Sequence, residues 1–336
     1  MKAFVLDKYK KKSTLRLADV PTPELRDDEV LVQVHAASVN QLDAKIRDGE
    51  FKAFLKYKLP IVLGHDVAGS VTRVGSRVSK FKVGDEVYSR PDDFHIGTFA
   101  EFIAVREISL AHKPKSLTME EAASIPLVGL TAWQALVEIA KLRAGQKVFI
   151  QAGSGGVGTF AIQLAKHIGA YVATTTSGSN AEWVKKLGAD LVIDYKKDDF
   201  ENILRDYDVV LNSQDGATLE KSLRVLKSGG KLISISGPPT PAFADQIKAP
   251  WYLKLVMSAL SRKIRKQAAQ RNVDFSFLFM KADGEQLRKI TALIESGKVK
   301  PVIDRVFPFA QTNEALAYVD SGRAKGKVVI KLSYLP

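Results

Sequence analysis

Four glycines between residues 153 and 158 form the spacing in this chain that most clearly indicates chemistry. The run Gly153-Ser154-Gly155-Gly156-Val157-Gly158 contains the pattern G-x-G-x-x-G, with a β-rich run at 147–152 before it and helical apolar spacing at 159–168 after it. The first glycine permits a tight turn, the second lets backbone approach a pyrophosphate, and the third lets helix and strand pack closely. Free N–H groups at the helix start favour anions. The run predicts a dinucleotide-binding loop; the alternative is a glycine-rich turn with a structural role alone.

The segment about 20 residues beyond the loop indicates which dinucleotide would bind. An NAD site places Asp or Glu there, to bind the ribose 2′-hydroxyl. Here residues 174–180 read TTTSGSN, with hydroxyl and amide side chains and no acid. Such groups accommodate a 2′-phosphate, which an acid would repel. The segment therefore favours NADP, with Thr176, Ser177 and Asn180 as candidate binding residues, unless the threonines reflect strand propensity alone.

Length and composition limit the classes of protein to consider. A chain of 336 residues predicts two domains, and 46% hydrophobic with 26% charged residues is ordinary for a globular protein. No apolar run approaches the roughly 20 residues of a membrane helix, and the N-terminus lacks a signal-peptide core. The chain contains no cysteine, which excludes disulfides, thiolate zinc ligands and cysteine nucleophiles. We therefore expect a cytoplasmic protein with no membrane partner.

The net charge of +13 favours anionic partners, and both NADPH and RNA are anionic. The basic residues are spread along the chain, however, and no zinc-finger or RRM signature accompanies them. Solvated charged faces therefore explain the charge better than nucleic-acid binding does.

The order of the predicted elements indicates an α/β fold. Residues 1–110 hold many short strand patterns with Gly and Pro between them, which suggests a small β-rich, barrel-like domain. Beyond the glycine loop, strands and helices alternate, as in a doubly wound parallel sheet. The expected strands are 191–194, 208–212, 231–236 and 274–280, and the expected helices are 181–187, 200–205, 217–227 and a basic stretch at 250–272. We expect one domain from 1–122 with 281–336, and a Rossmann domain at 123–280 inserted into it.

Four ordered motifs make the chain resemble the medium-chain dehydrogenase/reductase superfamily. They are Gly64-His65-Asp66-Val67-Ala68-Gly69, VGDEV at 83–87, Gly129-Leu130-Thr131-Ala132 and the loop at 153–158. SVN at 38–40, DAK at 43–45, LGAD at 187–190 and GKVKPV at 297–302 resemble its zinc-independent quinone oxidoreductase and enone (2-alkenal) reductase branch. The resemblance spans essentially the whole chain. It implies a doubly wound Rossmann sheet inserted in a GroES-like domain.

Zinc-dependent members of that superfamily bind the metal through a cysteine, the histidine of a Gly-His-Glu motif and a third ligand. Here Asn40 stands at the cysteine position, Asp66 follows His65, and the structural lobe of four cysteines is missing. A catalytic zinc needs about three protein ligands. We therefore expect no metal, and we interpret His65 as a hydrogen-bonded histidine of the cleft wall.

The resemblance implies hydride transfer from NADPH to the β-carbon of an activated alkene, with negative charge developing on the carbonyl oxygen. It assigns Asn40 and Lys45 to the cleft as an amide donor and a charged donor, and Thr131 to the nicotinamide end. Each residue also has a structural interpretation: Asn40 as a helix cap, Lys45 as a solvated lysine and Thr131 as a core residue.

The resemblance also implies a set of cofactor-binding residues beyond the loop. The family's phosphate pocket uses a lysine near Asn180, for which Lys185 or Lys327 would have to compensate here. The remaining candidates are Tyr195, Phe279 and Arg323. Apolar wall candidates for the substrate are Phe54, Tyr57, Phe94, Trp251 and residues 277–279, each of which suits a core position equally well.

The leading hypothesis is an NADPH-dependent reductase of enones, enals or quinones. The alternatives are an NADPH reductase of quinones alone, a cofactor-binding protein that acts on RNA through its basic surface, and a zinc alcohol dehydrogenase. We also expect a homodimer. The segment 274–280 should be an edge strand on which Phe275, Phe277 and Phe279 alternate, and similar proteins pair this strand across a two-fold axis.

Overall fold

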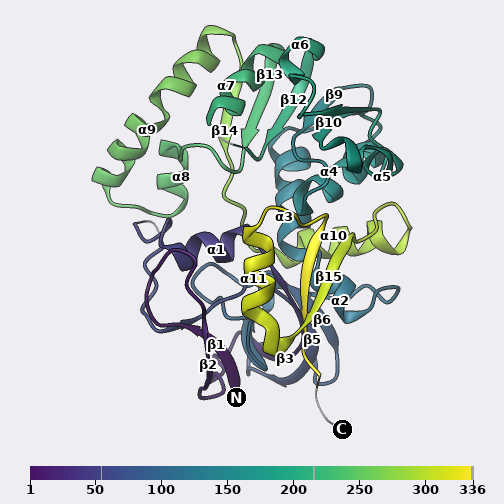
Figure 1. The fold of residues 1–336 in the computed structure, drawn as a ribbon. Coiled ribbons are helices and arrows are strands. Elements are labelled where there is room, and N and C mark those ends of the chain that lie inside the picture. Colours follow the sequence, from purple (N-terminus) through teal and green to yellow (C-terminus); the bar gives the residue numbers. More distant parts are fainter. Residues whose placement is uncertain (54, 215, 334–336) are drawn as a thin grey trace. The chain divides into compact units, whose positions relative to one another are not determined.

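The computed structural model describes residues 1–53, 55–214 and 216–333, and the chain divides into two compact units (Figure 1). Unit 1 comprises Met1–Leu130 and Lys281–Pro336, and unit 2 comprises Thr131–Met280. The expected first boundary, 122/123, falls inside helix α2 (Met119–Ala123). Because α2 packs on β3 (Glu29–Val39) and β5 (Asp66–Val74), it belongs to unit 1, and the division comes after Leu130.

Unit 1 is built mainly of β-structure. Among its described residues, a seven-stranded sheet has the order β15-β16-β3-β5-β6-β8, with β7 also paired to β3. A smaller sheet has the order β2-β1-β4. Besides β3 and β5, these strands are β1 (Lys2–Leu6), β2 (Arg16–Asp19), β4 (Ile61–Val62), β6 (Glu86–Ser89), β7 (Phe102–Arg106), β8 (Leu110–His112), β15 (Ile303–Pro308) and β16 (Lys327–Lys331). The predicted β-rich domain is thereby confirmed.

The long strand β3 is the centre of unit 1, because β16, β5 and β7 all pair with it. Its apolar residues Val30, Val32 and Val34 are fully buried. Helix α1 (Gln41–Asp48) begins directly after β3 and ends at Gly49, whose φ of 83° is the left-handed conformation that glycine adopts at little cost. Two further helices of unit 1 are α10 (Gly284–Glu295) and α11 (Thr312–Asp320).

Unit 2 contains a parallel sheet of the order β11-β10-β9-β12-β13-β14, six strands among its described residues. The strands are β9 (Lys147–Ile150), β10 (Tyr171–Thr176), β11 (Leu191–Asp194), β12 (Tyr207–Asn212), β13 (Leu226–Ser234) and β14 (Asp274–Phe277). In chain order this is 3-2-1-4-5-6, the doubly wound arrangement, whose direction reverses between β9 and β12. The predicted fold class is confirmed.

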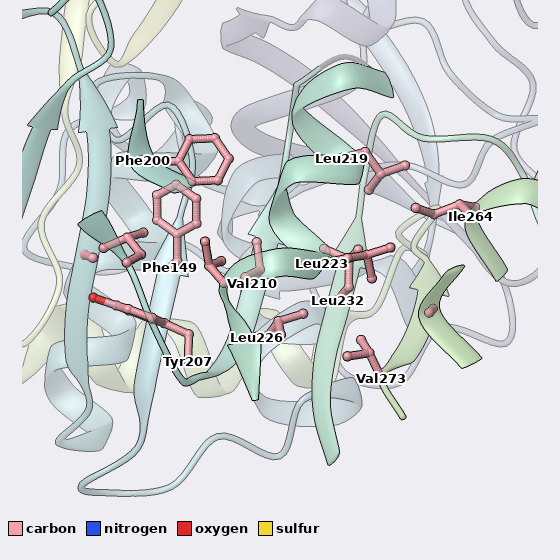
Figure 2. Close-up of a cluster of buried hydrophobic side chains, with 14 of the residues drawn as sticks. Phe149, Phe200, Tyr207, Val210, Leu219, Leu223, Leu226, Leu232, Ile264 and Val273 are labelled. Carbon is pink, nitrogen blue, oxygen red and sulfur yellow. The ribbon is translucent and has the colours of Figure 1, made fainter. Parts of the chain in front are cut away.

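Helices cover both faces of this sheet. Helix α4 (Gly156–Ile168) packs on β9 and β10. An apolar cluster on the other face joins the sheet to α6 (Phe200–Ile203), α7 (Gly216–Val225) and α9 (Trp251–Gln270), and Figure 2 shows Phe149, Phe200, Leu223 and Ile264 within it. The remaining helices of unit 2 are α5 (Ala181–Lys186), α8 (Pro241–Gln246) and the end of α3 (Pro126–Trp133), which continues as the π-helical segment η2 (Gln134–Ile139).

The last strand of unit 2 differs from its prediction. It lies at the sheet edge as expected, but it ends at Phe277 rather than at residue 280. Its partner β13 ends at Ser234, whose carbonyl accepts from Leu278 N at 2.8 Å, so the chain beyond has no strand to pair with. The three phenylalanines are covered within unit 2: Phe275 packs on the apolar cluster, Phe277 lies edge-on to Phe243, and Phe279 is buried.

Across the described ranges, no helix combines the length and the apolar character that a membrane crossing requires.

Candidate functional site

The glycine loop of unit 2 has the tight geometry that its pattern predicts. It joins β9 to α4, and Gly153 N donates to Thr175 O at 2.9 Å. A Cβ on Gly153 would lie 2.3 Å from Thr174 Oγ1, and one on Gly158 would lie 2.2 Å from Ala152 O. A side chain at Gly153 would meet Thr174 on β10, and one at Gly158 would meet the backbone of the loop itself, so both positions favour glycine.

The start of α4 supplies amide donors. Its first i→i−4 bond runs from Thr159 N to Gly155 O at 2.9 Å. The amides of Gly156, Val157 and Gly158 come before this bond, in the first turn where a helix leaves its N–H groups for an anion. The loop can therefore hold a phosphate through backbone alone.

The end of β10 carries the predicted hydroxyl-rich turn. Thr176 is buried, and in the described part of the chain its Oγ1 has no hydrogen-bond partner. Asn180 Nδ2 donates to Ser177 Oγ at 3.1 Å, and Trp183 Nε1 donates to Asn180 Oδ1 at 3.2 Å. The turn is thus held by its own side chains.

An acid that the sequence analysis missed reaches the same turn. Asp194 ends β11, opposite Thr176 in the parallel register, and a Cβ on Gly178 would lie 2.5 Å from Asp194 Oδ2. Segment 174–180 is itself free of acids, but the turn is not. The signal was available, because the carboxyl ends of neighbouring parallel strands meet at one sheet edge. The next residue, the candidate Tyr195, is 61% exposed.

A second missed feature lies where the strand order reverses. Gln151 Nε2 donates to Ser222 Oγ at 2.8 Å, Asn212 Nδ2 donates to Gln151 Oε1 at 2.7 Å, and Ser234 Oγ donates to Asn212 Oδ1 at 2.7 Å. All four side chains are buried. We call Gln151, Asn212, Ser222 and Ser234 the amide chain. It links the carboxyl ends of β9, β12 and β13, the edge at which such sheets bind ligands.

Unit 1 holds a group of buried polar residues around the end of β3. We call it the charged cluster; its members are Ser38, Asn40, Asp43, His65, Asp66 and Lys327, all buried. Asp66 is its centre. Its Oδ2 accepts from Ser38 Oγ at 2.7 Å, from Asn40 Nδ2 at 2.9 Å and from Lys327 Nζ at 3.2 Å, and its Oδ1 accepts from Leu127 N at 2.7 Å.

The contacts of Lys327 differ from those expected of a residue that binds the 2′-phosphate. Its ammonium donates to Asn40 Oδ1 and to Val39 O as well as to Asp66. An ammonium has three donors, and all three are used inside unit 1. Lys327 therefore has no donor left for a 2′-phosphate, and its contacts make it a residue that holds Asn40.

Asn40 is bonded at both ends of its amide. Its Oδ1 accepts from Lys327, its Nδ2 donates to Asp66, and its backbone N donates to Asp43 Oδ2 at 2.7 Å. It is also the N-cap residue of α1. The helix-cap interpretation therefore describes its backbone, and the cluster fixes the orientation of its side chain.

The charged cluster does not fit a catalytic zinc. His65 is fully buried, its Nδ1 lies 2.5 Å from Asp43 Oδ1, and its Nε2 has no partner among the described residues. The Lys327 ammonium already lies 3.2 Å from Asp66, and a dication beside it would be repelled. Within the residues described, no three His, Cys, Asp or Glu side chains form a group that could hold a metal ion.

The remaining candidates of unit 1 have varied surroundings. Lys45 is half-buried on α1, and no hydrogen bond or ion pair to a described residue occupies its ammonium. Arg323 is exposed in the turn after α11.

Tyr57 donates to Asp93 O at 2.6 Å, and burial raises the pKa of its hydroxyl, so Tyr57 stays neutral. Phe94 is 63% exposed. The wall candidate Phe54 lies outside the described residues.

Three candidates belong to unit 2. Thr131, the first residue of unit 2, is buried on α3. Phe279 is buried, and its ring centroid lies 5.2 Å from that of Phe243, so it is part of the unit's core. Trp251 is 74% exposed at the start of α9.

A dinucleotide loop on a doubly wound sheet, combined with a separate β-rich unit, defines an α/β oxidoreductase fold. Residues 26–115 match the alcohol dehydrogenase GroES-like domain and residues 187–330 match the zinc-binding dehydrogenase family. The chain is 38% identical to the NADPH-dependent alkenal/one oxidoreductase of Arabidopsis thaliana, over 98% of this chain and 79% of that protein. It is 39% identical to the 2-methylene-furan-3-one reductase of Solanum lycopersicum, with the same coverage.

A solved structure shows the same architecture. The quinone oxidoreductase of Coxiella burnetii superposes with a TM-score of 0.87 at 32% identity, over 99% of both chains. This protein therefore belongs to the medium-chain dehydrogenase/reductase superfamily, in its quinone oxidoreductase and alkenal/one reductase branch, which confirms the resemblance seen in its motifs.

Proposed function

We propose that this oxidoreductase uses NADPH to reduce the activated C=C bond of α,β-unsaturated carbonyls, or quinones. The observation that supports this most is the glycine loop followed by a hydroxyl-rich turn with one buried, unpartnered hydroxyl on Thr176. The relatives named above, which reduce alkenals, enones or a methylene-furanone by their names, support the substrate class.

The residues present fit the dinucleotide. Amides of Gly156, Val157 and Gly158 would hold its pyrophosphate at the start of α4. Thr176, Ser177 and Asn180 would hold the adenosine ribose and its 2′-phosphate. Tyr195 and Arg323 remain candidates for the same phosphate. When bound, NADPH supplies the hydride.

The chain's own residues would stabilise the negative charge that forms on the substrate oxygen. Lys45 is our candidate donor, because its half-buried ammonium has no partner among the described residues. A positioned cation lowers the barrier only if it interacts more strongly with the enolate than with the carbonyl. Asn40 is held in one orientation by Lys327 and Asp66, and it would act as a second donor by exchanging its 3.4 Å bond to Ser38 O for one to the substrate. Thr131 would contact the nicotinamide end.

Two measurements test the proposal. In a fluorescence titration, NADPH should bind at least tenfold more tightly than NADH, a difference of about 1.4 kcal/mol. In steady-state assays, NADPH should be oxidised with short-chain enones, enals or quinones, and NADP⁺ should not be reduced with primary alcohols. Equal or tighter binding of NADH would contradict the cofactor assignment. Activity with alcohols alone, together with one zinc per chain by elemental analysis, would favour an alcohol dehydrogenase.

We also propose a homodimer that pairs β14 with its copy. The support is that β14 is the last strand of the sheet order, so one side of its backbone lies open in the described chain. Light scattering at micromolar concentration should give twice the chain mass of 36.9 kDa; the mass of a single chain would contradict it. Since the Arabidopsis relative is chloroplastic by name, the expected cytoplasmic location stays a prediction.

A further inference from the structure

The exposed face of α9 differs between its two ends. This helix, pale green in Figure 1, leads into β14. Its buried residues are Met257, Ser261, Ile264 and Ala268, which recur at the spacing of one helical face. The side chains on the opposite face therefore point to solvent.

The first half of that exposed face is apolar. Trp251, Tyr252, Leu255, Val256 and Leu260 are between 48% and 74% exposed. Of the fourteen large apolar side chains that are exposed among the described residues, these five fall within ten consecutive positions. Single exposed apolar residues are ordinary, but a contiguous group of them marks an interaction site.

The second half of the face is cationic. Helix α9 contains five Lys or Arg residues and no Asp or Glu. Lys254 pairs with Asp245 at 2.6 Å and Lys263 pairs with Glu220 at 2.5 Å. Arg262 and Lys266 are exposed and have no ion pair in the part of the chain that the structure describes. Their charge is available to an anionic partner.

We propose that the α9 surface, formed by Trp251, Tyr252, Leu255, Val256 and Leu260 together with Arg262 and Lys266, binds an anionic lipid bilayer. Trp and Tyr side chains suit the interface between headgroups and acyl chains, and leucines insert below it. The unpaired cations would lie against lipid phosphates, which attract Lys and Arg near a membrane surface. Because α9 does not have the character of a membrane-crossing helix, it would rest in the interface.

Two other occupants fit this surface less well. In a second copy whose α9 overlaps this one along its full length about a two-fold axis, the apolar half of each helix would lie against the cationic half of the other. Arg262 and Lys266 would then lose water against the apolar side chains of the partner without gaining a counter-ion. An RNA would pair with the cations but would leave Leu255, Val256 and Leu260 facing its phosphates.

The test is co-sedimentation of the full chain with vesicles. Vesicles of equal parts phosphatidylcholine and phosphatidylglycerol should bind the protein at least about tenfold more strongly than vesicles of phosphatidylcholine alone, and added salt should weaken the binding. The fluorescence of Trp251 should shift to the blue in the bound state, as its ring leaves water.

Paired variants separate the two halves of the surface. Trp251→Ser with Leu255→Ser should lower binding to the mixed vesicles by about tenfold or more, because two inserted side chains are lost. Arg262→Gln with Lys266→Gln should remove most of the preference for phosphatidylglycerol. The control for the apolar variant is Leu17→Ser with Val306→Ser, which removes two exposed apolar residues of unit 1. The control for the cationic variant is Lys10→Gln with Lys11→Gln, which removes two exposed positive charges. Both controls should bind as the unaltered protein does.

Several results would overturn the proposal. One is the absence of binding to the mixed vesicles. Another is an equal loss of vesicle binding in the variants and in their controls, at unchanged melting temperatures. A third is a protein that does not bind vesicles and whose dimer mass is halved by Trp251→Ser with Leu255→Ser. Salt-sensitive binding of single-stranded RNA, without vesicle binding, would assign the surface to RNA. The readouts do not depend on enzyme turnover, so they are independent of the proposed reaction.

Discussion

The charged cluster of unit 1 and the amide chain of unit 2 are both buried hydrogen-bond networks at strand ends, but their chemistry differs. The first contains an ammonium, two carboxyl groups and an imidazole, whereas the second contains two amides and two hydroxyls. Each neutral bond in the amide chain can be lost at a modest cost. In the charged cluster, removal of one partner leaves a buried charge without compensation. The two networks should therefore respond very differently to the loss of one residue.

The largest effect should come from Asp66→Ala. Lys327, Asn40, Ser38 and the amide of Leu127 each lose one acceptor, and Lys327 becomes a buried cation without a counter-ion. We expect the free energy of unfolding to fall by about 3–5 kcal/mol, measured by urea denaturation.

Two further variants make this result specific. Asp66→Ala combined with Lys327→Met should recover part of the loss, because the uncompensated charge is gone. Asp7→Ala breaks the exposed pair with Arg16 and should scarcely change stability. Equal losses for Asp66→Ala and Asp7→Ala would show that burial of the charge is unimportant.

The second effect contrasts two lysines. Lys327 has used its donors inside unit 1, whereas Lys45 has no partner among the described residues. Lys45→Ala should lower turnover with a short-chain enone by about ten- to a hundredfold, or roughly 1.4–2.7 kcal/mol of transition-state stabilisation. Its stability should hardly change, and Lys11→Ala is the control. Turnover within about twofold of the unaltered enzyme would show that Lys45 is a solvated lysine without a catalytic role.

Asn212→Ala tests the neutral network. Gln151, Ser234 and Ser236 each lose one hydrogen-bond partner, but no charge is left unpaired. We expect a loss of about 1–2 kcal/mol in urea denaturation. A loss as large as that of Asp66→Ala would mean that the amide chain acts as one cooperative unit, and the contrast between the two networks would fail.

The smallest effect concerns the acid beside the hydroxyl-rich turn. If the Asp194 carboxylate opposes a bound 2′-phosphate, Asp194→Asn should tighten NADPH binding about two- to fivefold and leave NADH binding unchanged. Nucleotide fluorescence titration measures both, with the exposed Asp198→Asn as control. Weaker binding of both nucleotides would show instead that Asp194 holds the turn around Gly178 in shape.

Local patterns predicted much of the fold because they act over a few residues. The glycine loop and the alternation of strands and helices in unit 2 are both confirmed. The extent of β14 was wrong, since the length of an edge strand depends on how far its neighbour β13 runs. Its phenylalanines are covered by Phe243 and the apolar cluster, contacts that the alternation in the sequence does not specify.

The sequence by itself determined the strand–turn–helix geometry of the glycine loop, because G-x-G-x-x-G between a strand and a helix acts over a few residues. It also determined that no acid occurs within 174–180. Only the tertiary structure decided that Lys327 bonds to Asn40 across a separation of 287 residues. The physical reason is that such contacts depend on strand register, here β16 and β5 on either side of β3, which no local pattern in the sequence specifies.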